Sequence, residues 1–349
     1  MILLETGIDG LLAIVGGVER SGLWTFVALS SVALLVRALR YRELIRAIAQ
    51  ETTVPSFSRF FIITALRNVL VDLLPARLGD LSFVYFAHRF HIPLVKAATA
   101  FGVCFALDII VLLVVISAFI ASAPLLSSTG VFGEQLKLFE QENVYAVTIL
   151  LGVGVAALLG WFVMRLPEFV ELIARRVNLW NGGQKYHPQL SGIARTFIKV
   201  EEVAVMVAAQ IRALQSSRRF LRLLGLSLVL RLIKYSSLYL LLVAVVSQWG
   251  YGYRDINPLL STFAFVTAEG VASLPISGFL GFGAYEGAWG MIFSLSHVKI
   301  PSVTSVIFAV HLITQMVAYI YGLVGFLMFL LSNKSCSNSA ERPGSGLGS

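Results

Sequence analysis

Charged residues are scarce in this chain. Asp, Glu, Lys and Arg make up 13% of the 349 residues, whereas roughly 25% is usual in a soluble domain. Hydrophobic residues reach 57%, and the mean hydropathy is +0.83. This composition excludes an ordinary soluble domain. It predicts an all-α integral membrane protein, because a helix satisfies its own backbone hydrogen bonds in lipid.

Cysteine and several functional motifs are also scarce or missing. Cys104 lies in an apolar run and Cys336 in a polar tail, so we expect no disulfide, and no metal-ligand spacing is present. The first residues lack the basic region of a cleavable signal peptide. The chain has no Walker motif, so we expect no nucleotide site. We also expect no cofactor and no metal. The net charge of +8 is attributed to basic cytoplasmic loops and not to a nucleic-acid partner.

Long apolar segments are what the chain does contain. About 20 residues cross the hydrocarbon core, and five segments are close to that length or longer: 23–39, 93–125, 144–166, 223–246 and 302–331. Two further apolar regions, 57–90 and 259–296, are interrupted by Pro and Gly. Residues 2–18 contain carboxylates and glycines, and we expect them to form an interfacial helix.

The basic residues orient these segments, because Lys and Arg gather in cytoplasmic loops. Of the 27 Lys and Arg, 15 lie in segments 37–59 and 165–222, which we therefore place in the cytoplasm. The first segment includes Arg37 and Arg40. Region 57–90 then begins and ends inside, and region 259–296 begins and ends outside. We expect two re-entrant, Pro/Gly-broken hairpins that enter from opposite faces, with pairs of full spans as the alternative.

The two interrupted regions also resemble each other in sequence. Each contains Thr-Ala, then Leu-Pro, then a glycine followed by a carboxylate, and then Ile-Pro before a long helix. Together with the opposite entry, this indicates an inverted repeat, although coincidence between Leu-rich segments is the alternative. We expect membrane halves at 1–166 and 220–331, a cytoplasmic amphipathic linker at 167–219 and a disordered tail at 332–349. Broken helices at matching positions in two halves point to a transporter's midplane site.

Ionisable side chains at membrane depth are candidates for that site, because inserting each costs about 2.5–3.5 kcal/mol. The candidates are Arg67, Asp72, Arg77, Asp80, Asp108, Arg231, Lys234, Glu269 and Glu286. Arg67 and Asp72 are expected to pair within one arm. His311 is expected to be a packed polar residue.

The most informative candidates are Arg231 and Lys234. Spaced i, i+3, they share one face of a helix. They need counter-charges from Asp108, Glu269 and Glu286, or from an anionic ligand such as a phosphate. A purely internal ion-pair cluster is the alternative.

At its two broken regions the chain resembles a known family, the flippase-like membrane region of lysylphosphatidylglycerol synthases. The stretches that carry the resemblance are "LPARLGD", the downstream "FALD" and "SLPISGFLGFGAYEGA". By resemblance, the first motif corresponds to Pro75, Arg77, Gly79, Asp80 and Asp108, and the second to Pro275, Gly281, Gly283 and Glu286. Asp80 stands where glutamate is usual, and Phe279 where a small residue is usual. The aminoacyl-transfer domain of two-part synthases is not seen, so synthesis is not implied.

The resemblance implies a multi-pass protein of a bacterial or archaeal inner membrane, with its C-terminus in the cytoplasm, that moves a polar lipid between leaflets. We expect a flippase and not an enzyme, with Arg77, Arg231 and Lys234 receiving an anionic headgroup. Asp80, Glu269 and Glu286 would contact amines or balance the cations, and Asp108 completes the candidate set. The alternatives are an enzyme acting on a lipid-linked substrate such as a polyprenyl-phosphate sugar, and a transporter of a soluble solute. A lipid-synthesising enzyme and a second copy of the chain stay open as partners.

Overall fold

Helices make up all the regular structure in the part of the chain that the computed structural model describes. That part comprises residues 2–49, 54–74, 79–128, 154, 157–158, 161, 165, 167–169, 172, 208–212, 214, 218–272, 283–294 and 303–340. The elements are α1 Ile2–Gly16, α2 Arg20–Ala49, α3 Phe57–Leu73, α4 Ser82–Arg89, α5 Leu94–Ser128, α8 Arg218–Val246, η4 Ser247–Trp249, α9 Pro258–Ala272, α10 Ala284–Ser294 and α11 Val303–Ala340.

Four of the described helices are long and apolar enough to cross a membrane. They are Arg20–Ile48, Leu94–Ala118, Arg218–Trp249 and Val303–Ser332. These helices confirm four of the five predicted spans. The fifth predicted span (144–166) and the linker (167–219) lie largely outside the described residues.

Both predicted helix interruptions are present. In the first half, α3 ends at Leu73 and α4 begins at Ser82. In the second half, α9 ends at Ala272 and α10 begins at Ala284. The start of α9 is well defined: Pro258 is its first residue, and the side-chain Oδ1 of Asn257 accepts the backbone N–H of Leu259 at 2.9 Å. Asn and Pro at these positions favour helix initiation.

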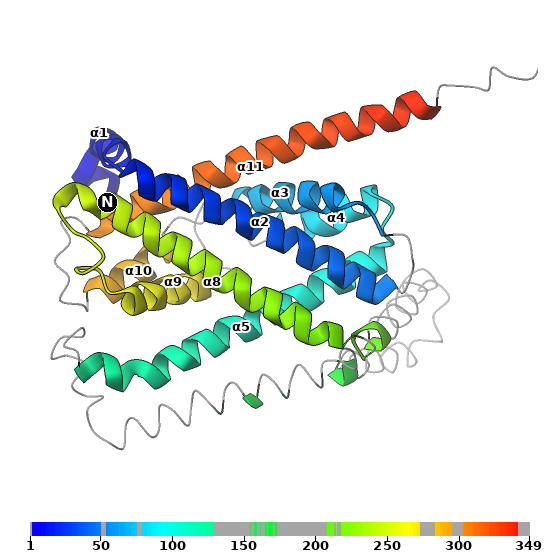
Figure 1. Cartoon of the computed structure of the whole chain (residues 1–349), viewed down its shortest axis with the longest axis horizontal. Helices are drawn as coiled ribbons and strands as arrows, with labels where there is room; N and C mark the ends of the chain where they lie inside the picture. The colour runs from blue at the N-terminus through cyan, green and yellow to red at the C-terminus, as the bar shows by residue number, and fades with distance from the viewer. Residues whose placement is uncertain are drawn as a thin grey trace, which may run out of the picture.

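Small residues allow the helices to approach one another closely. Figure 1 shows α2 lying along α8, and the two are antiparallel, with Gly22 near the start of α2 against Ala244 near the end of α8. A Cβ at Gly22 would collide with the Ala244 side chain. On α11, Gly322 and Gly325 likewise face the α3 helix. Small residues at helix contacts are typical of membrane bundles, where close packing drives association.

The apolar core has two clusters, and each draws mostly on one half of the chain. One cluster gathers α2 through α5 around Tyr41, Phe60 and Phe83. The other gathers α8 through α11 around the fully buried Trp289 and Phe265. Helices of both halves therefore surround the space between the clusters.

The helix α11 extends into the region predicted to be a disordered tail, and residues 341–349 of that region lie outside the described residues. Residues from 332 onward are polar, but α11 continues to Ala340. The C-terminal part of this helix projects beyond the bundle in Figure 1. Good helix propagation from a long apolar segment accounts for the extension, since each added residue gains a hydrogen bond without a new nucleation cost.

Candidate functional site

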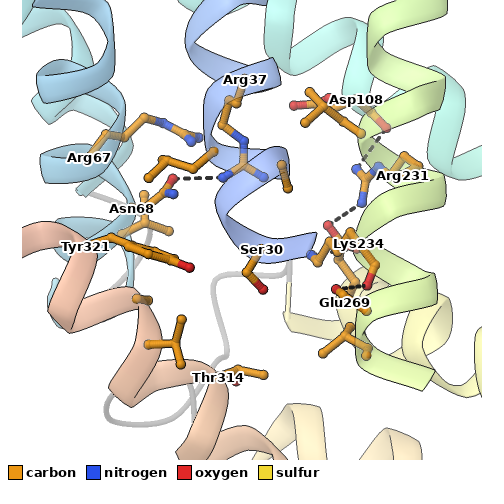
Figure 2. A pocket seen from close by; sticks show the side chains of 18 of the residues that line it. Ser30, Arg37, Arg67, Asn68, Asp108, Arg231, Lys234, Glu269, Thr314 and Tyr321 are labelled. Atoms are coloured by element: carbon orange, nitrogen blue, oxygen red, sulfur yellow. Dashed lines mark hydrogen bonds and ion pairs between the residues drawn. The ribbon is translucent and has the colours of Figure 1, made fainter. Parts of the chain in front are cut away.

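A cavity of about 450 Å³ lies inside the bundle. Its wall draws residues from α2, α3, α5, α8, α9, α10 and α11, and from the break between α3 and α4. This volume is within the range of about 300–1,000 Å³ that small-molecule sites usually have. Figure 2 shows charged side chains directed into the space from opposite walls.

One wall is formed by α8 and α9. Glu269 on α9 forms ion pairs with both Arg231 and Lys234, the latter at 3.0 Å from Nζ to Oε2. Tyr235 joins the same cluster: Arg231 Nη1 donates to its hydroxyl at 3.2 Å, and that hydroxyl donates to Glu269 at 3.1 Å. Arg231 also donates from Nη2 to the backbone carbonyl of Asp108 at 3.1 Å. The counter-charge that the sequence required for Arg231 and Lys234 is therefore Glu269.

A second cluster ties three helices together at the cavity wall. Arg40 on α2 is 1% exposed and holds the Asp108 carboxylate of α5 with two hydrogen bonds, at 2.5 Å and 3.0 Å. The same guanidinium donates to the Ser227 hydroxyl of α8 at 2.8 Å. A bidentate arginine–carboxylate pair is among the strongest and most directional polar contacts. Asp108 thus lines the cavity while its carboxylate is held by Arg40.

The opposite wall is formed by α2, α3 and the residues after the first break. Arg67 on α3 pairs with Asp80, which is 6% exposed. Arg37 on α2 donates to the Asn68 side-chain carbonyl at 2.8 Å. The sequence did not suggest Asp80 as the partner of Arg67, and the side chain of Asp72, with which a pair was expected, lies outside the described part of the structure. Asp80, which follows the first break, thus contacts α3.

The location expected for Arg37 and Arg40 also needs correction. The charge pattern assigned both to a cytoplasmic segment, but α2 continues to Ala49 and carries both into the cavity wall. A usable signal was present in the sequence, because buried apolar residues continue past them at helical spacing, including Leu44 and Ile48. Arg37 and Arg40 are also spaced i, i+3, as are Arg231 and Lys234 on α8.

A third polar cluster lies near the second break. Glu286, 3% exposed, accepts the backbone N–H of Gly283 at 2.6 Å and pairs with the His311 ring on α11. The other ring nitrogen of His311 lies 3.0 Å from the Gln315 amide nitrogen. His311 and Gln315 line the cavity, whereas Glu286 lies behind them and faces His311. His311 is a buried polar residue, as expected, but its carboxylate partner was not predicted.

The predicted site residues are thus largely brought together. Those that line the cavity are Asp80, Asp108, Arg231, Lys234 and Glu269. Gly79 and Gly283 mark the described ends of the two breaks. The remaining predicted residues, Pro75, Arg77, Pro275 and Gly281, lie outside the described residues. Within the described ranges, no group of three or more His, Cys, Asp or Glu residues could hold a metal ion.

These features define the class of the protein: a helical membrane protein with a charged internal cavity and two interrupted helical regions. The chain belongs to the family of the lysylphosphatidylglycerol synthase transmembrane region, whose family description matches residues 1–322. A comparison with curated proteins gave no match. Membership in this family indicates a membrane lipid-related function.

Proposed function

We propose that the protein moves a lipid with a polar, phosphate-containing headgroup between the two leaflets of its membrane. A headgroup cannot cross hydrocarbon without losing its hydration, which is costly unless polar groups replace the water. The cavity offers such a replacement, since charged side chains from α2, α3, α5, α8 and α9 line a volume of about 450 Å³. This charged cavity is the observation that carries the proposal.

The family membership supports a lipid as the substrate, and the arginines support a phosphate. A guanidinium presents paired donors that match two phosphate oxygens. The acyl chains need no polar path and would remain in the surrounding lipid. We infer that the protein acts without a covalent step, and that a gradient or mass action drives movement.

We further propose that the two interrupted regions are re-entrant hairpins that enter from opposite faces as an inverted repeat. The support is the matching order of break, glycine and buried carboxylate: Gly79 and Asp80 in the first half, Gly283 and Glu286 in the second. The distribution of basic residues along the chain supports a cytoplasmic C-terminus in this proposal. The membrane in this proposal is the inner membrane of a bacterium or archaeon.

Leaflet exchange in reconstituted liposomes tests the proposed transport. Fluorescent phospholipid is placed in both leaflets, and a membrane-impermeant quencher reports how fast the inner pool becomes accessible. We expect wild-type protein to accelerate exchange and Arg231→Ala to slow it at least tenfold, because charge-assisted hydrogen bonds contribute about 1.5–3 kcal/mol. Arg46→Gln is the matched control, since Arg46 is exposed on α2 and pairs with Glu43.

Two other outcomes would replace the proposal. Absence of lipid exchange together with uptake of a soluble solute would identify a solute transporter. Turnover of a lipid-linked sugar by the purified protein would identify an enzyme. A lipid-synthesising partner or a second copy of the chain can be detected by co-purification from crosslinked membranes.

A further inference from the structure

The described cavity wall carries more positive than negative charge. Its cations are Arg37, Arg40, Arg67, Arg231 and Lys234, and its carboxylates are Asp80, Asp108 and Glu269. Five cations against three carboxylates leave an excess of two positive charges on these lining residues. Unbalanced charge at membrane depth is costly, so an occupant with negative charge would stabilise the wall.

The first excess charge lies on Arg37. Its polar partner among the described side chains is the Asn68 carbonyl, which is a neutral acceptor. The neighbouring arginines Arg40 and Arg67 instead each hold a carboxylate. Figure 2 shows Arg37 projecting from α2 into the space between Arg67 and Arg231. Arg37 therefore presents to the cavity a guanidinium whose hydrogen-bond partner is neutral, while Asp108, which also attracts it, is held in an ion pair by Arg40.

The second excess charge lies on the opposite wall. Glu269 is a single carboxylate shared by Arg231 and Lys234. The Lys234 side chain is 39% exposed, whereas that of Arg231 is 10% exposed. Because the ammonium group ends a flexible stem, Lys234 is the member of the pair that can turn toward an occupant. Arg37 and Lys234 thus face one cavity from two antiparallel, packed helices.

Building on the proposed function, we propose that Arg37 and Lys234 together bind the headgroup of a lipid phosphate monoester. A phosphate monoester carries about −1.5 to −2 charges near neutral pH, which matches the excess of two. Arg37 would bind two phosphate oxygens with its fork, and Lys234 would contact the third as a point charge. A phosphodiester has one negative charge and leaves one cation unbalanced. A zwitterionic headgroup has no net charge and balances neither.

Lipid binding in nanodiscs tests this assignment. Purified protein is exposed to equal amounts of phosphatidic acid (a phosphate monoester), phosphatidylglycerol and phosphatidylcholine, and the bound lipid is counted by native mass spectrometry. We expect at least a tenfold preference for phosphatidic acid over phosphatidylglycerol in the wild type. Arg37→Gln should bring the two lipids to near-equal occupancy, and Arg37→Lys should retain part of the preference. Arg46→Gln, on the same helix, should leave the preference unchanged.

The outcomes separate this inference from the proposed function. Equal binding of the two lipids by wild type, or a preference that survives Arg37→Gln in a folded protein, overturns the inference. Leaflet exchange measured on the same preparations would then show whether transport itself remains. Absence of exchange for every lipid overturns the proposed function instead. Displacement of phosphatidic acid by an equal concentration of inorganic phosphate would identify a free-anion site and overturn the lipid assignment.

Discussion

The two interrupted regions place a carboxylate at the same point but hold it differently. After the first break, Asp80 pairs with Arg67 and lines the cavity. After the second break, Glu286 pairs with His311 and lies behind the cavity wall. Arginine is always charged in proteins, whereas an imidazole is charged only when protonated. The Arg67–Asp80 pair is therefore always an ion pair. The His311–Glu286 pair can instead be a hydrogen bond between a neutral imidazole and a carboxylate.

The glycines at the two breaks also serve different purposes. Gly79 lies against the backbone of Leu70 on α3, and a Cβ at Gly79 would overlap it. Gly283 has open space around it but adopts a φ of +110°, which L side chains rarely adopt. The first glycine permits a close approach and the second permits a backbone conformation. A shared sequence pattern thus satisfies two separate steric requirements.

The largest expected effect comes from separating the Arg67–Asp80 pair. Arg67→Gln leaves the buried Asp80 carboxylate without its counter-charge, and removing one partner of a buried pair costs about 3–5 kcal/mol. The double variant Arg67→Gln, Asp80→Asn should recover much of this loss, because two amides can hydrogen-bond without charge. Unfolding in detergent micelles gives the free energies. Arg89→Gln, an exposed arginine on α4, is the control, and a double variant no more stable than Arg67→Gln would contradict the pairing.

The second largest expected effect is a difference in stability between variants of Gly79 and of Gly283. Gly79→Ala should destabilise the protein by about 3 kcal/mol, because the added Cβ meets backbone that cannot move without displacing α3. Gly283→Ala should cost about 1–2 kcal/mol, the strain of a positive φ. Gly102→Ala in α5 is a matched control with open space, and it should be neutral or stabilising by up to about 1 kcal/mol. Equal losses at Gly79 and Gly283 would show that the two breaks are sterically alike.

Much of the fold followed from hydropathy and from Pro and Gly alone. The positions of α5, α8 and α11 and of both breaks were predicted, because lipid tolerates few alternatives to a continuous apolar helix. The need of Arg231 and Lys234 for a counter-charge also followed from the sequence, since buried cations need one, but Glu269 was only one of the candidates. The helices and breaks follow from local sequence properties, and the need for a counter-charge follows from the cost of burying a charge.

What the sequence could not predict depends on the register of helices and on contacts across the fold. Arg37 and Arg40 were counted as loop residues, because a charge count does not show where a helix ends. A partner of Arg67 was expected at Asp72, five positions along the same arm, and nothing in the local pattern indicated that Asp80, beyond the break, would contact Arg67. A single histidine in an apolar helix, His311, gives no signal that a carboxylate 25 residues earlier will face it.

The smallest expected effect concerns that histidine and completes the comparison of the two carboxylates. His311→Gln should lower the free energy of unfolding by about 1 kcal/mol. The glutamine amide can still donate to Glu286, and the Glu286 carboxylate still accepts the backbone N–H of Gly283, which lies at 2.6 Å. His88→Gln, at an exposed position on α4, should cause no change. Unfolding free energies measured beside those of Arg67→Gln provide the test. If His311→Gln costs as much as Arg67→Gln, then the Glu286–His311 contact is a full ion pair, and the two interrupted regions hold their carboxylates in the same way.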